Sequence, residues 1–290
     1  MDENELASAF EVQRPYLFTV AYHLLGTVAD AEDAVQEAWL RLQRSDIRRF
    51  DHFKAWLTQV TARICLDQLR SAHTRRETYV GDWLPEPLVA DEAAGDPAEQ
   101  VTLDDSVGLA MLVVLETLSP AQRTAFVLHD VFGMPFEEIA EVVGRTPASV
   151  RQLASRSRRL LHERRPRFDN DPVAQRMAIE SFLTAARGGD LEGLVRILDP
   201  DVVWRSDGGG RPGAPQRTMR GAGAVARMVV RQAPRYVSHA HMVTVNGALG
   251  VAVRSDQELY AVIGFSVHAG LITQDLAVYN PDKLRRVRLG

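Results

Sequence analysis

Cysteine, lysine and long apolar runs are what this 290-residue sequence has least of. Its single cysteine, Cys65, excludes an intrachain disulfide and any zinc or iron–sulfur site built from several cysteines. No apolar run approaches the roughly 18 residues of a membrane-spanning helix. The opening segment MDENELASAF lacks the basic and apolar blocks of a secretory signal peptide. We therefore expect a cytoplasmic protein that carries no metal ion and no other cofactor.

The composition is that of a soluble, folded chain. Apolar residues make up 46% and charged residues 25%, which excludes collagen-like, low-complexity and wholly disordered proteins. The length fits two or three domains. Changes in charge, in proline content and in helical or strand periodicity along the chain predict folded parts at residues 1–76, 101–167 and 171–290, with an acidic linker at residues 77–100.

Charge is distributed in blocks that the net charge of −4 conceals. Residues 1–40 are acidic, with Arg14 as the only arginine or lysine, and residues 41–76 are rich in arginine. Residues 77–122 contain neither arginine nor lysine, whereas residues 145–167 are again strongly basic. Alternating blocks of opposite sign indicate separate surfaces for separate partners.

The first part has helical spacing throughout. Asp30 is a plausible N-cap, and apolar residues follow it at helical intervals up to Leu42. A second apolar face starts at Phe53, after a polar, basic segment that contains Phe50. Prolines break the linker, yet it holds the run WLPEP at residues 83–87. A tryptophan in an otherwise solvated linker indicates that the segment docks onto a folded part.

The second part predicts a helix-turn-helix. Ser119 to Gln122 form a capping box with proline at the first helical position, and a glycine-containing turn at Gly144 separates two later helices. On the last helix the residues predicted to face inward are Val150, Leu153, Ala154, Ser157 and Leu161. Those predicted to face outward are Ala148, Arg151, Gln152, Ser155, Arg156 and Arg159. Such small, amide and arginine side chains suit a DNA major groove.

The third part changes to a mixed pattern. Helices are expected at residues 173–186, 191–198 and 222–232, and strands at 202–206, 236–245, 248–254, 259–268 and 271–279. Helices followed by a meander of strands predict an α+β domain, with helices packed on a curved antiparallel sheet.

These motifs together resemble a known family. Residues 30–42, 53–63 and 66–70 are similar to region 2 of extracytoplasmic-function sigma factors of the sigma-70 family, and residues 118–123 and 137–144 to region 4. Residues 83–87, 207–210 and 280–284 resemble the subgroup with a SnoaL-like C-terminal extension. The resemblance covers nearly the whole chain. It implies two all-α sigma regions followed by an α+β SnoaL-like cone, in a protein that is not an enzyme.

The resemblance also implies partners and contact residues. A sigma factor would bind the β′ clamp and β flap of core RNA polymerase and direct it to promoter DNA. The implied −35 contacts are Arg145, Ser149, Arg151, Gln152, Ser155, Arg156 and Arg159. The implied −10 contacts are Arg48, Arg49, Phe50, Lys54 and Arg63. The implied polymerase contacts are Asp33, Gln36, Glu37 and Trp39.

The three motifs of the extension imply a regulatory role for the C-terminal domain. Its implied residues are Trp83, Pro85, Asp207, Gly208, Gly209, Gly210, Asn280, Pro281, Asp282 and Lys283. The basic tail (Lys283, Arg285, Arg286 and Arg288) also suggests an ionic contact with the acidic linker or with the loop at Asp207. Such a contact would hold regions 2 and 4 in one relative placement.

Three alternatives stay open. A one-component helix-turn-helix regulator would explain the second and third parts but not the first. An isomerase-like enzyme would need a base in an apolar pocket, for which the candidates are Trp204, Asp207, Tyr236, His239, His241, Asp275 and Tyr279. His239 and His241 share one face of an expected strand, but two ligands do not define a metal site. A pocket for an unidentified small-molecule effector is the third.

Overall fold

The computed structural model describes residues 3–45, 52–76, 79, 81–91, 108–164, 169, 171–210, 218–255, 258–287 and 289. The chain divides into two compact units. The first comprises residues 1–78 and 114–165, and the second comprises residues 79–113 and 166–290. The described residues 79, 81–91 and 108–113 therefore belong structurally with the C-terminal part of the chain. No helix in the described ranges is long and apolar enough to cross a membrane.

The first unit is helical. Its elements are α1 (Glu3–Leu25), α2 (Val28–Gln43), α3 (Phe53–Arg76), α6 (Pro120–Phe126), a π-helical segment (Val127–Val131), α7 (Phe136–Val143) and α8 (Pro147–Arg164). The expected cap at Asp30 is wrong, because α2 begins one turn earlier. Thr27 is extended and its hydroxyl oxygen accepts from the Asp30 backbone N–H at 3.2 Å. Asp30 accepts a hydrogen bond from the same hydroxyl at 2.7 Å, so it supports the cap from inside the helix.

The predicted helix-turn-helix is present within this unit. The Ser119 and Gln122 capping box starts α6 with Pro120 in its first turn. Gly144, at φ 70°, ends α7 in the left-handed conformation that glycine adopts without strain. The Thr146 hydroxyl oxygen accepts from the Ser149 backbone N–H at 3.3 Å at the start of α8. Local capping chemistry thus fixes both ends of the turn.

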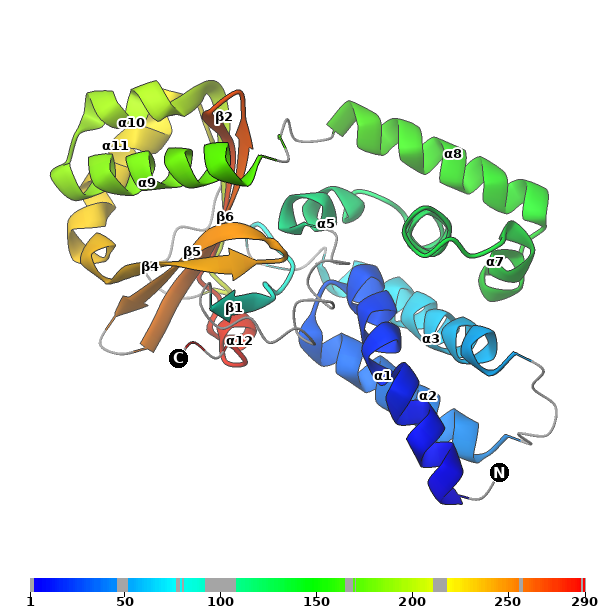
Figure 1. Cartoon of the computed structure of the whole chain (residues 1–290). Helices are drawn as coiled ribbons and strands as arrows, with labels where there is room; N and C mark the ends of the chain where they lie inside the picture. Colours follow the sequence, from blue (N-terminus) through cyan, green and yellow to red (C-terminus); the bar gives the residue numbers. More distant parts are fainter. Residues whose placement is uncertain are drawn as a thin grey trace. The chain divides into compact units, whose positions relative to one another are not determined.

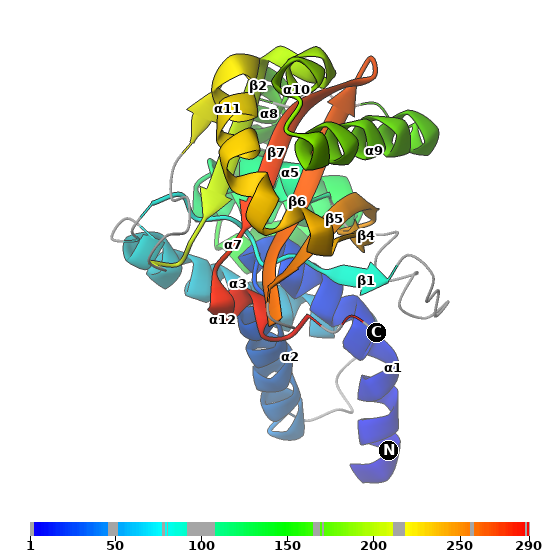
Figure 2. The same ribbon diagram turned by 90° about the vertical axis from the view of Figure 1, so that its left-hand side faces the viewer.

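The second unit is an α+β domain (Figures 1 and 2). Its helices are α9 (Pro172–Gly188), α10 (Leu191–Ile197), α11 (Ala222–Gln232) and α12 (Pro281–Leu284), and residues up to Val113 of α5 (Leu109–Leu115) belong to it as well. Its strands are β1 (Val89–Asp91), β2 (Leu198–Asp207), β3 (Met219–Arg220), β4 (Ala240–Val245), β5 (Ala248–Ser255), β6 (Glu258–His268) and β7 (Leu271–Val278). They form one sheet in the order β1-β4-β5-β6-β7-β2-β3.

Apolar side chains cover both faces of this sheet. Helices α9, α10 and α11 pack on one face, around a core that includes Phe182, Trp204 and Phe265. Leu109, Val113 and residues of α12 pack on the other face. In both views β1 and α12 lie at the end of the sheet away from α10 (Figures 1 and 2).

The expected fold class is confirmed in its architecture: the helical unit is accompanied by a C-terminal α+β unit with a curved sheet. Three details differ from the expectation. Strand β2 runs parallel to β7, so the sheet is mixed although its other pairs are antiparallel. The linker supplies a strand, β1, that was not predicted. The strand expected from Tyr236 starts only at Ala240, after two 3-10 turns, so His239 does not share a strand face with His241.

Candidate nucleic-acid interface and linker-binding site

Helix α8 presents a polar, basic face. All five residues predicted to face inward are buried, and all six predicted to face outward are exposed. Arg145, in the turn before the helix, is also exposed, while Ser149 is half-buried beside its cap. The amphipathic spacing therefore predicted correctly which side of α8 meets solvent.

Some arginines of this face already pair within the unit. Arg151 donates to a Glu137 carboxylate oxygen at 2.8 Å, and Arg158 donates to Asp130 at 2.6 Å. The Arg151 guanidinium also lies 5.4 Å from the centre of the Phe136 ring. The pair of Arg151 with Glu137 is more than half exposed on both sides and is therefore weak, whereas Asp130 in the other pair is only 22% exposed.

The residues expected to contact polymerase lie on α2. Asp33 and Gln36 are exposed, and Glu37 accepts from Arg41 at 2.9 Å. Trp39 is half-buried, with its ring 5.0 Å from that of Phe10. Asp33 and Gln36 are thus accessible to a partner, Glu37 is already paired with Arg41, and Trp39 contributes partly to the packing of α2 against α1.

The residues expected at the −10 element are only partly described. Arg48, Arg49 and Phe50 lie outside the described residues. The Lys54 ammonium lies 3.9 Å from the centre of the Tyr16 ring. Arg63 donates to the Glu141 carbonyl oxygen at 3.4 Å, so in this arrangement it contacts α7.

Sequence reasoning missed a buried cation in the first unit, Arg123. Its guanidinium donates to the His23 carbonyl oxygen at 3.2 and 3.3 Å and pairs with Glu116. These bonds join the end of α1 to α6. Burial, and then the charge of Arg123, lower the pKa of His23 to about 4. The capping motif marks the start of α6, but its pattern does not reveal that this arginine points inward.

A second site forms where the linker meets the C-terminal domain. Asp207 is fully buried at the end of β2. It accepts from the backbone N–H of Leu84 at 3.0 Å, from the Tyr79 hydroxyl at 2.6 Å and from the Lys283 ammonium at 2.7 Å. Lys283 also donates to the Leu84 carbonyl oxygen. An ion pair from the domain therefore holds both backbone polar groups of one linker residue.

Aromatic and amide groups complete this linker-binding cluster. The Lys283 ammonium lies 4.0 Å from the centre of a Trp83 ring. Asn280 donates to the Tyr79 oxygen at 2.9 Å and accepts from the Asp282 backbone N–H, which caps α12. Burial and the neighbouring Asp207 carboxylate raise the pKa of Tyr79.

Gly209 has a steric role in the same cluster. Its φ is +57°, and a Cβ there would lie 2.4 Å from the Asn280 side chain. Glycine is therefore the residue that this turn accepts without displacing Asn280.

The structure thus brings together members of all three extension motifs, namely Trp83, Asp207, Gly209, Asn280 and Lys283. Pro85 and Gly208 are buried nearby in the chain, and Pro281 opens α12. Gly210 and Asp282 are exposed, and Asp282 pairs with Arg285 at 2.9 Å. Tyr79 was missed, because its contact with Asp207 spans residues far apart in sequence.

The contact expected of the basic tail exists for Lys283, which binds Asp207 and a linker carbonyl rather than an acidic linker side chain. Arg288 lies outside the described residues. Trp83 docks as the linker sequence suggested.

The candidates for an enzyme do not form one site. Trp204, Tyr236 and Tyr279 line a cavity between the helices and the sheet, whereas Asp207 belongs to the linker-binding cluster. His239 and His241 are both exposed. Asp275 is buried in the sheet.

Comparison with known proteins identifies both sigma regions. Family models for sigma-70 region 2 and sigma-70 region 4 match residues 10–75 and 109–161. The chain is 45% identical to the ECF RNA polymerase sigma factor SigJ of Mycobacterium tuberculosis over 248 residues, 84% of this chain and 79% of that protein. It is 35% identical to the probable ECF sigma factor SigI of the same species, over 98% of this chain and 96% of that protein.

The structural comparison agrees. The crystal structure of M. tuberculosis SigJ superposes with a TM-score of 0.79 and 38% identity, over 98% of this chain and 100% of that one. These three findings lead to one assignment: the two family-model matches, the relatives that cover most of the chain, and the superposition over 98% of it. The chain belongs to the extracytoplasmic-function RNA polymerase sigma factors, the subunits that direct transcription initiation by RNA polymerase.

Proposed function

We propose that region 4 of this sigma factor reads the −35 element through the exposed face of α8. The observation that carries the proposal is the separation of that helix into a buried, mainly apolar side and an exposed side rich in arginine, with glutamine and serine. Arginine pairs with guanine edges and phosphates, and glutamine pairs with adenine. Arg145, Ser149, Arg151, Gln152, Ser155, Arg156 and Arg159 are the proposed contacts.

Region 2 is proposed to bind both the β′ clamp and the −10 element. Asp33, Gln36, Glu37 and Trp39 would face the clamp, because exposed carboxylates complement a basic surface. Arg48, Arg49, Phe50, Lys54 and Arg63 would meet the opened DNA, where cations bind the backbone and an aromatic ring stacks on a base. The contact of Arg63 with Glu141 would then have to break, so promoter binding is coupled to separation of α3 from α7.

The C-terminal domain is proposed to regulate by capturing the linker between regions 2 and 4. The Asp207 and Lys283 pair binds the backbone of Leu84, and β1 adds a strand of the linker to β4. A segment bound at both places has a fixed path, and this limits how far the two regions can separate. Trp83, Pro85, Gly208 to Gly210 and Asn280 to Asp282 shape that binding site.

Run-off transcription with bacterial core polymerase on a promoter library tests the DNA contacts. The full chain should give sequence-specific transcripts, and Arg156→Ala should lower them about tenfold at the same promoters. Arg187→Ala, which removes an exposed arginine of α9, is the matched control and should leave them unchanged. Tight, specific DNA binding by the free chain, with no transcription, would support the one-component regulator instead.

The regulatory step needs its own comparison. Tyr79→Phe removes one hydrogen bond to Asp207 but keeps the ring, and it should alter transcript yield without altering promoter choice. Deletion of residues 280–290 should have a larger effect of the same sign, and a chain truncated after residue 167 shows the output without the domain. Equal yields from all four proteins would refute regulation by linker capture.

A further inference from the structure

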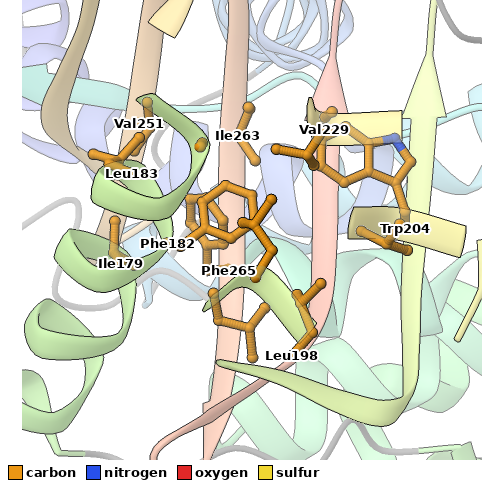
Figure 3. Close-up of a cluster of buried hydrophobic side chains, with 14 of the residues drawn as sticks. Ile179, Phe182, Leu183, Leu198, Trp204, Val229, Val251, Ile263 and Phe265 are labelled. Carbon is orange, nitrogen blue, oxygen red and sulfur yellow. The ribbon is translucent and has the colours of Figure 1, made fainter. Parts of the chain in front are cut away.

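Helix α11 of the second unit has one buried face and one exposed face. The buried face packs on the sheet and is formed by Ala222, Val225, Ala226, Met228 and Val229. Figure 3 shows Val229 in this core, near Trp204. Arg227 and Arg231 are exposed and lie one helical turn apart, about 6 Å along the axis. Arg235, also exposed, follows four residues later in the 3-10 turn after α11. We call these three arginines the α11 stripe.

The α11 stripe lies in a long stretch of the chain without acidic residues. Between Asp207 and Asp256 the sequence has seven arginines and no aspartate, glutamate or lysine. Among the described residues, the structure pairs none of the three stripe arginines with an acid, and none of them donates a side-chain hydrogen bond. Their positive charge therefore faces solvent.

Several arginines on other helices lie one turn from an acid that they contact. The pairs are Arg14 with Glu11, Arg41 with Glu37, Arg70 with Asp67, Arg176 with Glu180 and Arg285 with Asp282. Helix α11 repeats arginine at this spacing instead, and like charges one turn apart repel each other and destabilise a helix. A bound polyanion removes that repulsion, so the arrangement indicates a partner with dense negative charge.

Duplex DNA is the polyanion that region 4 brings within reach. DNA carries one negative charge for about every 1.7 Å of its axis, and arginine binds phosphate oxygens in pairs. Seven residues separate Arg164, at the end of α8, from Pro172, at the start of α9, and an extended chain between these two residues spans at most about 29 Å. DNA bound by α8 is therefore close to the domain that begins with α9. This step rests on the proposed function of α8.

We propose that the α11 stripe binds the phosphate backbone of promoter DNA beside the −35 element. Contacts with phosphates position a protein on DNA but do not read its sequence. The stripe therefore adds affinity and salt dependence to promoter binding, while promoter choice stays with regions 2 and 4. The C-terminal domain thus has a DNA-binding surface formed by residues other than those of the linker-binding cluster.

The salt dependence of promoter binding tests this proposal. Holoenzyme assembled from core polymerase and the full chain is titrated with a promoter fragment at several salt concentrations. The double variant Arg227→Gln, Arg231→Gln should lower the slope of log affinity against log salt by about 2, because each phosphate contact contributes about 0.9. The double variant Arg187→Gln, Arg196→Gln removes the same charge from exposed positions of α9 and α10, and it should leave the slope unchanged. Lysine at positions 227 and 231 keeps the cations and should retain the slope.

Hydroxyl-radical footprints of the same complexes locate the contact. Protection of the backbone beside the −35 element should disappear in the α11 double variant and persist in the α9 and α10 control. An unchanged slope, or an equal loss in both double variants, would overturn the proposal. Weaker binding to core polymerase with an unchanged DNA slope would assign the stripe to an acidic protein surface and would overturn it as well.

Arg156→Ala in the same titration tests region 4 separately. If Arg156→Ala leaves promoter binding unchanged while the α11 double variant lowers the slope, the proposed function of α8 fails and the stripe still binds DNA. If Arg156→Ala weakens binding while the α11 double variant leaves the slope unchanged, only the stripe proposal fails.

Discussion

The charged side chains of α8 and those around Asp207 lie in opposite environments. Arg151, Arg156 and Arg159 are exposed, and the ion pair of Arg151 with Glu137 leaves both side chains more than half in water. Lys283 and Asp207 are instead only 8% and 0% exposed. Exposed pairs contribute ~0–1 kcal/mol to stability, whereas loss of one partner from a buried pair costs about 3–5 kcal/mol. Removal of a charged side chain from α8 should therefore cost little stability, whereas removal of Lys283 or Asp207 should destabilise the second unit strongly.

The difference in burial between α8 and the Asp207 cluster determines what each site can bind. An exposed arginine is accessible to solvent and to a partner, and its removal should change binding rather than folding. A buried pair that also bonds both polar groups of Leu84 holds one segment in one place. The first arrangement suits reading of DNA, and the second suits capture of a linker.

The largest expected effect is at Lys283. Lys283→Met leaves the Asp207 carboxylate buried without its cation, and we expect the second unit to lose about 3–5 kcal/mol of unfolding free energy. Urea unfolding of the full chain measures this. Arg285→Met removes a cation of the same helix whose pair with Asp282 is three-quarters exposed, and it should cost less than about 0.5 kcal/mol. Similar losses in the two variants would contradict the comparison.

Gly209 tests the shape of the same cluster. Gly209→Ala places a Cβ 2.4 Å from Asn280 at a positive φ, and we expect a loss of roughly 2–3 kcal/mol from steric and backbone strain together. Gly210→Ala is the matched control, since Gly210 also has a positive φ but has nothing within 4 Å of its Cβ position. It should lose only about 1 kcal/mol. If Gly210→Ala lost as much unfolding free energy as Gly209→Ala, backbone strain alone would explain the loss, without a steric contribution from Asn280.

Asp275 tests a third case, a buried acid without a counter-charge. Its pKa in the folded chain is about 8, above the value near 4 of an unfolded chain, so its contribution to stability is present below pH 4 and is lost as pH rises through 8. Asp275→Asn does not titrate. Its stability relative to the natural chain should therefore rise between pH 4 and pH 8, by roughly 5 kcal/mol, because each pKa unit of the shift is worth about 1.4 kcal/mol. Denaturation series at several pH values check this, and a difference independent of pH would be inconsistent with a buried neutral carboxyl.

The smallest expected effect on stability is on α8. Arg156→Ala should change unfolding free energy by less than about 0.5 kcal/mol, because an exposed side chain is removed from a helix. The same variant should lose about 1–3 kcal/mol of promoter binding in the assembled holoenzyme. Thermal unfolding and promoter-binding titrations on one preparation separate the two effects. A variant that unfolds readily would remove the distinction between α8 and the Asp207 cluster.

Much of the helical half was predictable because its signals are local. Capping at Ser119, the left-handed turn at Gly144 and the two sides of α8 each depend on a few neighbouring residues. The same reasoning placed the cap of α2 at Asp30 instead of Thr27, since both residues are good caps and only the backbone angles distinguish them. Arg123 could not be recognised as buried, because its acceptor is a carbonyl of another helix.

The sequence by itself determined the sigma regions, the amphipathic face of α8, the α+β character of the C-terminal part and the motifs that meet around Asp207. Helical and strand periods and capping residues carry the face of α8 and the α+β pattern within short windows, whereas the sigma regions and the motifs around Asp207 were assigned from the resemblance to the family. The tertiary structure alone decided that Lys283 and Asp207 hold the backbone of Leu84, that β2 runs parallel to β7, and that Asp275 is flanked by Trp204 and Phe265. Strand register and buried polar contacts join residues far apart in the chain, and their energies depend on burial, which no local pattern contains.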